Sequence, residues 1–268
     1  MRTSMTRSIN FLRRHHVAVG APLALLIVAI AAGVTPSQAA LVIGDFAPSI
    51  LFGRDDDNQN NPAVQPPGTA ANQSLNNTDI IAGRDGNDVI VGLLGSDVLT
   101  GGGGSDIIIG GPEQGTTPNS DVMFGDTGDD INIWAPGDGS EVFIGGEGND
   151  AIVFGVIDKD ASNRPTSGGP APGFAHIPTA NVSGMGGFCT IERVHPSTGY
   201  EFLAKFFGRA AGNLIVTVRL REVEQFFCAS QAGGQITYAD LRQSNPQLDV
   251  VSLSQVLEIN NTVGRIIR

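Results

Sequence analysis

The residues with the clearest chemical potential in this sequence are acids that recur at a regular spacing. They stand at positions 79, 88, 97, 106, 121, 130, 141 and 150, so most intervals are nine residues. A glycine precedes most of them by two positions, and a short run rich in aliphatic residues follows each. Each unit therefore predicts six residues of turn followed by three residues of strand.

The segment that carries these acids is strongly negative. Residues 79–150 contain 14 acidic residues and one basic residue, whereas residues 151–268 contain nine acidic and ten basic residues. Carboxylates on stacked turns would lie about 5 Å apart, where like charges repel by roughly 3 kcal/mol at an effective dielectric of ~20. Calcium (Ca2+) would remove this repulsion, because it binds carboxylate and backbone carbonyl oxygens. Nucleic acid is disfavoured as a partner, because a phosphate-binding face needs Lys and Arg.

The sequence disfavours two other interpretations of these turns. Gly, Asn and Asp are good turn formers without any ion, although turn chemistry alone would accept Asn or Ser at the acid position. A phosphate-binding glycine loop is disfavoured, because "GGGGS" is not followed by lysine and the segment contains none.

Four units, "GRDGNDVIV", "GGGGSDIII", "GDTGDDINI" and "GGEGNDAIV", carry a resemblance to a known family. They resemble the nonapeptide G-G-x-G-x-D-x-U-x of RTX (haemolysin-type) calcium-binding repeats. The resemblance implies a parallel β-roll with two nonapeptides per coil, so that Asp79 shares a side with Asp97, and Asp88 with Asp106. Calcium would then lie between turns two units apart. The predicted metal-binding residues are Asp79, Asp85, Asp88, Asp97, Asp106, Asp121, Asp126, Asp130 and Asp150.

The repeat also departs from this pattern. Asn132 occupies a core position, residues 112–120 form an inserted loop, and Glu141 replaces the usual aspartate, which leaves a metal site there in doubt. The first four units are expected to bind best.

The apolar positions of the units predict two faces. The middle residues of the triplets form a narrow core that only a stack can bury: Ile81, Ile90, Leu99, Ile108, Met123, Phe143 and Ile152. The last residues are also apolar and would need a cover, for which the C-terminal region is the nearest candidate: Val91, Ile109, Phe124, Ile133, Ile144 and Val153.

Residues 1–40 predict a secretory signal peptide. Four arginines precede an apolar run from Val17 to Val34, and small residues allow cleavage near Ala39 or Ala40. An uncleaved membrane anchor is the alternative. We expect a secreted, extracellular or periplasmic protein with no stable membrane span after leader removal.

The rest of the chain predicts an all-β fold: an RTX-like parallel β-roll over residues 79–155, followed by a small β-rich domain with short helices over 156–268. Residues 41–78 predict an irregular cap or linker, and 161–173 a linker. Strands are expected at 187–194, 199–207, 213–220 and 224–229, with a hairpin between the second and third. Short helices are expected at 237–243 and 252–259.

Cys189 and Cys228 are the only cysteines, and each lies in a strand-like run. Export would favour a disulfide between them, with two buried thiols as the alternative.

No catalytic motif emerges. His195 has Glu192 three residues before it, which would matter only if both lay in a cleft. The sequence therefore predicts a secreted calcium-binding protein with a structural, adhesive or interaction role, and an extracellular matrix or surface partner. The alternative is a secreted hydrolase or lyase that uses the roll as a calcium-dependent folding or docking module. A pore-forming toxin is disfavoured, because no long apolar segment follows residue 40.

Overall fold

The structure is a computed structural model that describes residues 41–52, 79–112, 120–161 and 163–268. The predicted signal peptide, most of the predicted cap and most of the inserted loop lie outside these residues. Within the described part of the chain, no helix is long and apolar enough to cross a membrane.

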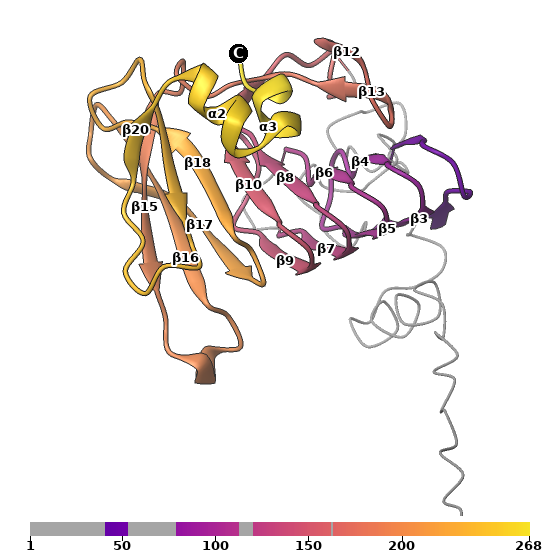
Figure 1. Cartoon of the computed structure of the whole chain (residues 1–268), viewed down its shortest axis with the longest axis horizontal. Coiled ribbons are helices and arrows are strands. Elements are labelled where there is room, and N and C mark those ends of the chain that lie inside the picture. Colours follow the sequence, from indigo (N-terminus) through magenta and orange to yellow (C-terminus); the bar gives the residue numbers. More distant parts are fainter. Residues whose placement is uncertain (1–40, 53–78, 113–119, 162) are drawn as a thin grey trace, which may run out of the picture.

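Two parallel stacks of short strands form the repeat segment, and they face each other across a narrow core (Figure 1). The first sheet contains β1 (Leu41–Ile43), β3 (Ile80–Asp85), β5 (Val98–Gly103), β7 (Val122–Thr127) and β9 (Val142–Glu147). The second sheet contains β2 (Ile50–Phe52), β4 (Val89–Val91), β6 (Ile107–Ile109), β8 (Ile131–Trp134) and β10 (Ala151–Phe154).

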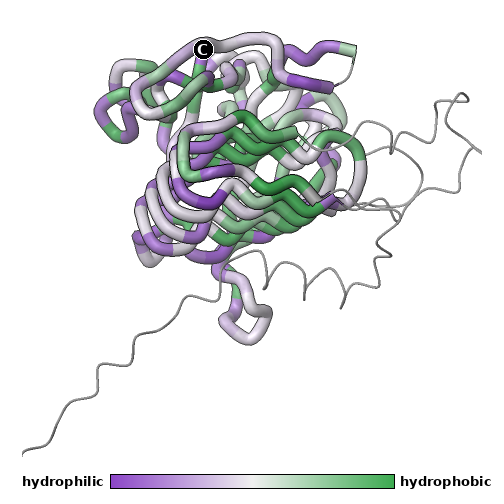
Figure 2. Tube along the Cα trace, turned by 90° about the vertical axis from the view of Figure 1, so that its right-hand side faces the viewer, coloured by the Kyte–Doolittle hydropathy of each residue, from purple (hydrophilic) through white to green (hydrophobic). Residues whose placement is uncertain are grey.

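The pairing register shows how the coils are built. Ile80 pairs with Val98, so one coil takes 18 residues, or two nonapeptides, as the resemblance implied. Residues 41–52 were predicted to be irregular, but β1 and β2 pair in parallel with β3 and β4 and add a coil at the N-terminal end. Figure 2 looks along the stack from that end and shows hydrophobic strands lying over one another beside hydrophilic turns.

The C-terminal strands continue the two sheets of the roll. In the first sheet β17 (Leu214–Arg221) pairs in parallel with β9, and β16 (Phe202–Gly208) and β15 (Gly187–Arg193) follow antiparallel. In the second sheet β18 (Gln225–Ala229) pairs in parallel with β10, and β19 (Ile236–Asp240) and β20 (Asp249–Val251) follow antiparallel. The hairpin predicted between the runs at 199–207 and 213–220 is confirmed.

The prediction of a helix at 237–243 was wrong, because most of this segment belongs to β19. Its alternating burial fits a strand that packs one face on the core. The predicted linker also contains a strand, β12 (Gly168–Ala171), which pairs with β13 (Phe174–Pro178). The two remaining short strands, β11 (Val156–Ile157) and β14 (Ala180–Asn181), pair with each other.

The helix predicted at 252–259 is α2 (Leu253–Ile259), and a second short helix, α3 (Asn261–Ile266), follows it. Ser252 caps α2 by accepting a hydrogen bond from the backbone N–H of Gln255, whose side chain bonds back to the backbone N–H of Ser252. A 3-10 turn, η2 (Pro196–Thr198), connects β15 and β16.

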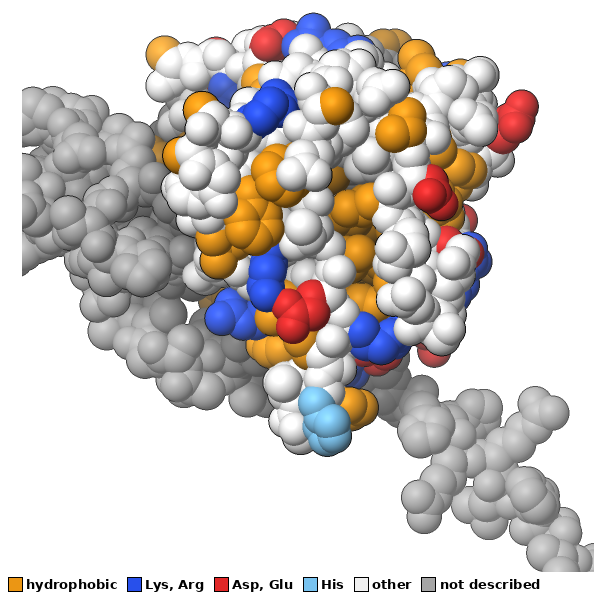
Figure 3. Space-filling model, turned by 90° about the vertical axis from the view of Figure 1, so that its left-hand side faces the viewer, with side chains coloured by type: hydrophobic (Ala, Val, Ile, Leu, Met, Phe, Trp, Pro, Cys, Tyr) orange, Lys and Arg blue, Asp and Glu red, His pale blue; other side chains and the backbone are white. Residues whose placement is uncertain are grey.

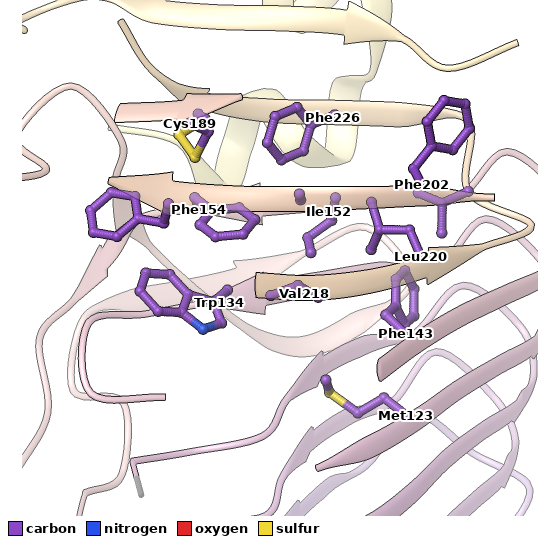
Figure 4. Packing of buried hydrophobic residues seen from close by; sticks show 14 of the residues in the cluster. Met123, Trp134, Phe143, Ile152, Phe154, Cys189, Phe202, Val218, Leu220 and Phe226 are labelled. Carbon is purple, nitrogen blue, oxygen red and sulfur yellow. A yellow bond between two sulfur atoms is a disulfide. The ribbon is translucent and has the colours of Figure 1, made fainter. Parts of the chain in front are cut away.

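The core between the sheets runs without a break from the repeats into the C-terminal strands. All seven predicted middle residues belong to one buried cluster, together with Trp134, Phe154, Phe202 and Phe226. Figure 4 shows this continuity, from Met123 within the roll to Cys189 and Phe226 in the C-terminal strands. The same cluster holds a disulfide between Cys189 and Cys228, whose Cα atoms are 6.1 Å apart, as predicted.

Among the described residues, the expected cover by the C-terminal region is found over the second sheet. There Ile109, Ile133 and Val153 are buried in a cluster with Val256 and Val263 of the C-terminal helices. On the first sheet, Phe124 and Ile144 stay half-buried, so the described C-terminal residues do not provide the expected cover there. The helices can cover one face only, because the two outer faces lie on opposite sides of the core.

Candidate metal centre

The repeated acids form two buried ladders, one at the start of each sheet's strands. The first ladder contains Asp79, Asp97, Asp121 and Glu141, and the second contains Asp88, Asp106, Asp130 and Asp150. Each of these side chains is at most 1% exposed.

One type of hydrogen bond links successive rungs. The backbone N–H of Asp88 donates to Oδ1 of Asp106 at 2.7 Å, and that of Asp106 donates to Oδ1 of Asp130 at 2.8 Å. Asp79, Asp97 and Asp130 make the same bond to the next rung. One oxygen of each accepting carboxylate is therefore used to hold the coils in register.

The second oxygen faces backbone oxygens across a space that glycine leaves open. A Cβ built on Gly83 would lie 2.6 Å from Asp88 Oδ2 and 2.5 Å from the carbonyl oxygen of Gly101. A Cβ on Gly125 would lie 2.3 Å from Asp130 Oδ2 and 2.4 Å from the carbonyl oxygen of Gly145. Any side chain at these glycines would collide with the oxygens, which explains why the repeat needs glycine here.

Five of these second oxygens are buried and have no hydrogen-bond partner within the described part of the chain: Oδ2 of Asp88, Asp106, Asp121, Asp130 and Asp150. Buried acceptors that converge without a donor are costly unless a cation is bound among them.

Burial also makes these carboxylates hard to ionise. It raises the pKa of Asp106 to about 7, and neighbouring acids add to the effect. Burial also raises the pKa of Asp130 and of Asp150 to about 8, and neighbouring acids again add to the effect. Loss of solvation disfavours the charged form, and a cation at the same place would favour it.

The donor set fits calcium. Carboxylate and carbonyl oxygens are the ligands of a hard cation that tolerates irregular coordination. Among the described residues no three His, Cys, Asp or Glu side chains gather into a cluster that could hold a metal. Backbone carbonyl oxygens must therefore supply part of the coordination, as those of Gly101 and Gly145 are placed to do.

The structure places seven of the nine predicted metal ligands on the ladders and two elsewhere. Asp85 is exposed at the end of β3. Asp126 has a left-handed backbone, with φ of 76°, and its Oδ2 accepts a hydrogen bond from Thr100 Oγ1 at 2.5 Å. Neither belongs to a ladder.

Sequence reasoning gave too little weight to Glu141 and missed Glu224. A Cβ on Gly110 would lie 2.1 Å from Asp121 Oδ2 and 2.6 Å from Glu141 Oε1, so Glu141 faces the same space as its neighbour on the ladder. Glu224 accepts a hydrogen bond from the backbone N–H of Asp150 at 2.7 Å. No glycine turn precedes Glu224, so its only signal in the sequence was the apolar pair Phe226-Phe227 that follows Gln225.

The comparisons with known proteins agree with the geometry. Residues 76–114 and 137–153 match the RTX calcium-binding nonapeptide repeat in four copies. No curated protein and no solved structure matches the chain. The match omits residues 115–136, where the structure nevertheless continues the coil through β7 and β8. Residues 76–114 and 137–153 of this chain are thus RTX repeats, which indicate calcium binding.

Proposed function

We propose that this is a secreted protein whose β-roll is ordered by calcium and whose role is structural, adhesive or interactive. One observation carries the proposal: five buried aspartate oxygens face the inside of the turns without a hydrogen-bond donor among the described residues. In the repeats these oxygens lie beside glycine carbonyls, which are further acceptors. Calcium satisfies both kinds of oxygen at once.

Calcium binding would then supply part of the folding free energy. Without metal, the two ladders stack buried carboxylates, and burial raises the pKa of Asp106, Asp130 and Asp150, so ionising these three at neutral pH opposes the compact state. A site assembled only in the folded turns adds its binding free energy to folding. Extracellular calcium modules are often tuned to ~10⁻⁴–10⁻³ M, so the roll would order outside the cell and not inside it.

The C-terminal strands would provide the surface for interaction. The end face that they form carries apolar side chains together with both Lys/Arg and Asp/Glu, without a block of one charge (Figure 3). Large apolar side chains exposed in this region include Leu214, Ile215 and Val250. A mixed surface of this kind suits a protein or polymer partner better than nucleic acid.

Export is part of the proposal. The N-terminal 40 residues have the composition of a signal peptide, and the disulfide between Cys189 and Cys228 suits an oxidising compartment. N-terminal sequencing of exported protein should find a start near Leu41. An intact Met1 would favour a membrane anchor instead.

The enzyme alternative gains no specific support from the described residues. His195 contacts Ser197 through Nδ1 at 2.8 Å on an exposed turn, and Glu192 is paired with Lys205. A pocket of about 680 Å³ lies over the outer face of the first sheet, between Phe124, Ile144 and Arg221. These features do not assemble a nucleophile, a base and an orienting group.

Calcium titration of the full chain, followed by circular dichroism, tests the proposal. We expect little β signal in a chelator and a cooperative gain of β signal in calcium, with a midpoint of ~10⁻⁴–10⁻³ M. Magnesium at the same concentrations serves as the control, because its strict octahedral geometry suits the irregular turns poorly. An unchanged spectrum with and without calcium would show that the roll needs no metal.

A further inference from the structure

The last coil of the roll is covered by a segment from outside the repeats. β17 and β18 pair in parallel with β9 and β10, with Leu220 opposite Phe143 and Phe226 opposite Ile152. Residues 219–227 therefore lie on the last coil as a further half coil. Its turn is only residues 222–224, whereas the coil beneath it uses residues 145–150 between its two triplets.

Glu224 takes the position of the acid in this half coil. The pairing of Ala151 with Gln225 places Glu224 opposite Asp150. The backbone N–H of Asp150 donates to Glu224 Oε2 at 2.7 Å, just as the backbone N–H of Asp130 donates to Asp150 Oδ1 at 2.8 Å. The backbone N–H of Glu224 in turn donates to the carbonyl oxygen of Asp150 at 3.0 Å. Glu224 is therefore the next rung of the second ladder.

The carbonyl of Glu222 takes the position of the glycine carbonyl. A Cβ on Gly145 would lie 2.0 Å from the carbonyl oxygen of Glu222 and 2.5 Å from Asp150 Oδ2. One coil earlier, the corresponding oxygens around Gly125 belong to Gly145 and Asp130. Glu222 has a left-handed φ of 54°, a conformation that glycine adopts far more readily.

The oxygen of Asp150 that faces this space requires a partner. Asp150 is fully buried, and its Oδ2 has no hydrogen-bond partner in the part of the chain that the structure describes. Arg242 is the cation whose charge acts on Glu224, but its guanidinium is bound to Asp240 at 2.8 Å and 3.1 Å. The space therefore gathers acceptors, which is the arrangement that binds a metal ion.

We propose that Asp150, the carbonyl of Glu222 and the carboxylate of Glu224 bind one further calcium ion at the junction between the roll and the C-terminal strands. The inference rests on the proposed function, because it extends the same ladder. Glu222 and Glu224 lie outside the residues that match the repeat. Calcium at this place joins two segments that are 74 residues apart in sequence.

The substitution Glu224→Gln tests this site, with Glu258→Gln as the matched control. Glutamine keeps an oxygen that can accept from Asp150 N–H but removes the charge of the metal ligand. The side chain of Glu258 is exposed on α2 and belongs to neither ladder. Both variants therefore lose one carboxylate from the C-terminal region. Equilibrium dialysis of the full chain with calcium gives the number of bound ions.

We expect E224Q to bind one calcium ion fewer than the wild type and E258Q to bind the same number as the wild type. Circular dichroism should show both variants folded in saturating calcium. Equal ion counts for E224Q and the wild type, an equal loss in both variants, or an E224Q protein that stays unfolded in calcium would each refute the junction site. Absence of calcium binding by the wild type would instead refute the proposed function.

Discussion

Replacing Asp106 with asparagine is expected to change stability in opposite directions with and without calcium. Burial raises the pKa of Asp106 from 3.8 to about 7 in the folded, metal-free chain. Because the folded pKa lies above the unfolded one, this carboxyl favours folding fully below pH 3.8 and loses that contribution as the pH rises through 7. At 1.36 kcal/mol per pH unit, the ionised carboxylate opposes folding at pH 8 by about 4 kcal/mol.

Asparagine removes this cost without removing the rung. Its carbonyl oxygen can still accept from the backbone N–H of Asp88, which lies 2.7 Å from Oδ1 in the native chain. In a chelator at pH 8, Asp106→Asn should therefore raise the free energy of unfolding by up to about 4 kcal/mol. In calcium it loses a charged ligand, so the calcium midpoint should rise on the order of tenfold, or ~1.4 kcal/mol.

Circular dichroism in a chelator, where Asp106→Asn should show more β signal than the wild type, and a calcium titration, both at pH 8, measure the two effects. Glu147→Gln is the matched control, because it removes one charge from the same acidic segment at an exposed side chain. The control should change both quantities little. If Asp106→Asn destabilised the metal-free chain, Asp106 could not be a buried charge that opposes folding. The aspartates of the ladder would then only form turns.

Two further predictions concern pH and the disulfide. Because burial raises the folded pKa of Asp130 and Asp150 to about 8, the β signal in a chelator should fall between pH 5 and 8, while calcium affinity should rise. Circular dichroism in a chelator and calcium titration at both pH values check this, and opposite trends would contradict it. Replacing both Cys189 and Cys228 with serine removes a link across 39 residues. On the chain-entropy model this should lower the free energy of unfolding in saturating calcium by roughly 4 kcal/mol. Urea unfolding measures the loss, and a loss below about 1 kcal/mol would count against the prediction.

The sequence was sufficient to predict the roll because the residues that determine each turn and strand of the roll lie close together in the sequence. A glycine two residues before most of the acids and a β-favouring triplet after each acid set the turn, the rung and the core position within nine residues. The row from Ile81 to Ile152 is buried as that pattern requires. Long-range pairing is not encoded locally, so the continuation of both sheets by β17 and β18 could not be predicted from periodicity.

The candidate site was predicted less completely for the same reason. Asp85 and Asp126 stand in acid-rich turns, yet their side chains lie off the ladders, because position in the coil matters more than acidity. Glu224 is on the ladder without any glycine motif, because its place is set by pairing with the strand that follows Asp150. A sequence motif identifies only residues that repeat. A ladder also contains residues, such as Glu224, that strand pairing brings into line with the repeated acids.

The continuity of the sheets gives calcium a wider effect than ordering the repeats. The core between the sheets is one cluster from Ile81 to Leu241, so the roll and the C-terminal strands cannot bury their apolar surface independently. The C-terminal strands start their pairing on β9 and β10, the strands that follow the rungs Glu141 and Asp150. Ordering those rungs with calcium would therefore create the edge on which β17 and β18 form. In that case removal of calcium should unfold the C-terminal strands together with the roll, in one transition.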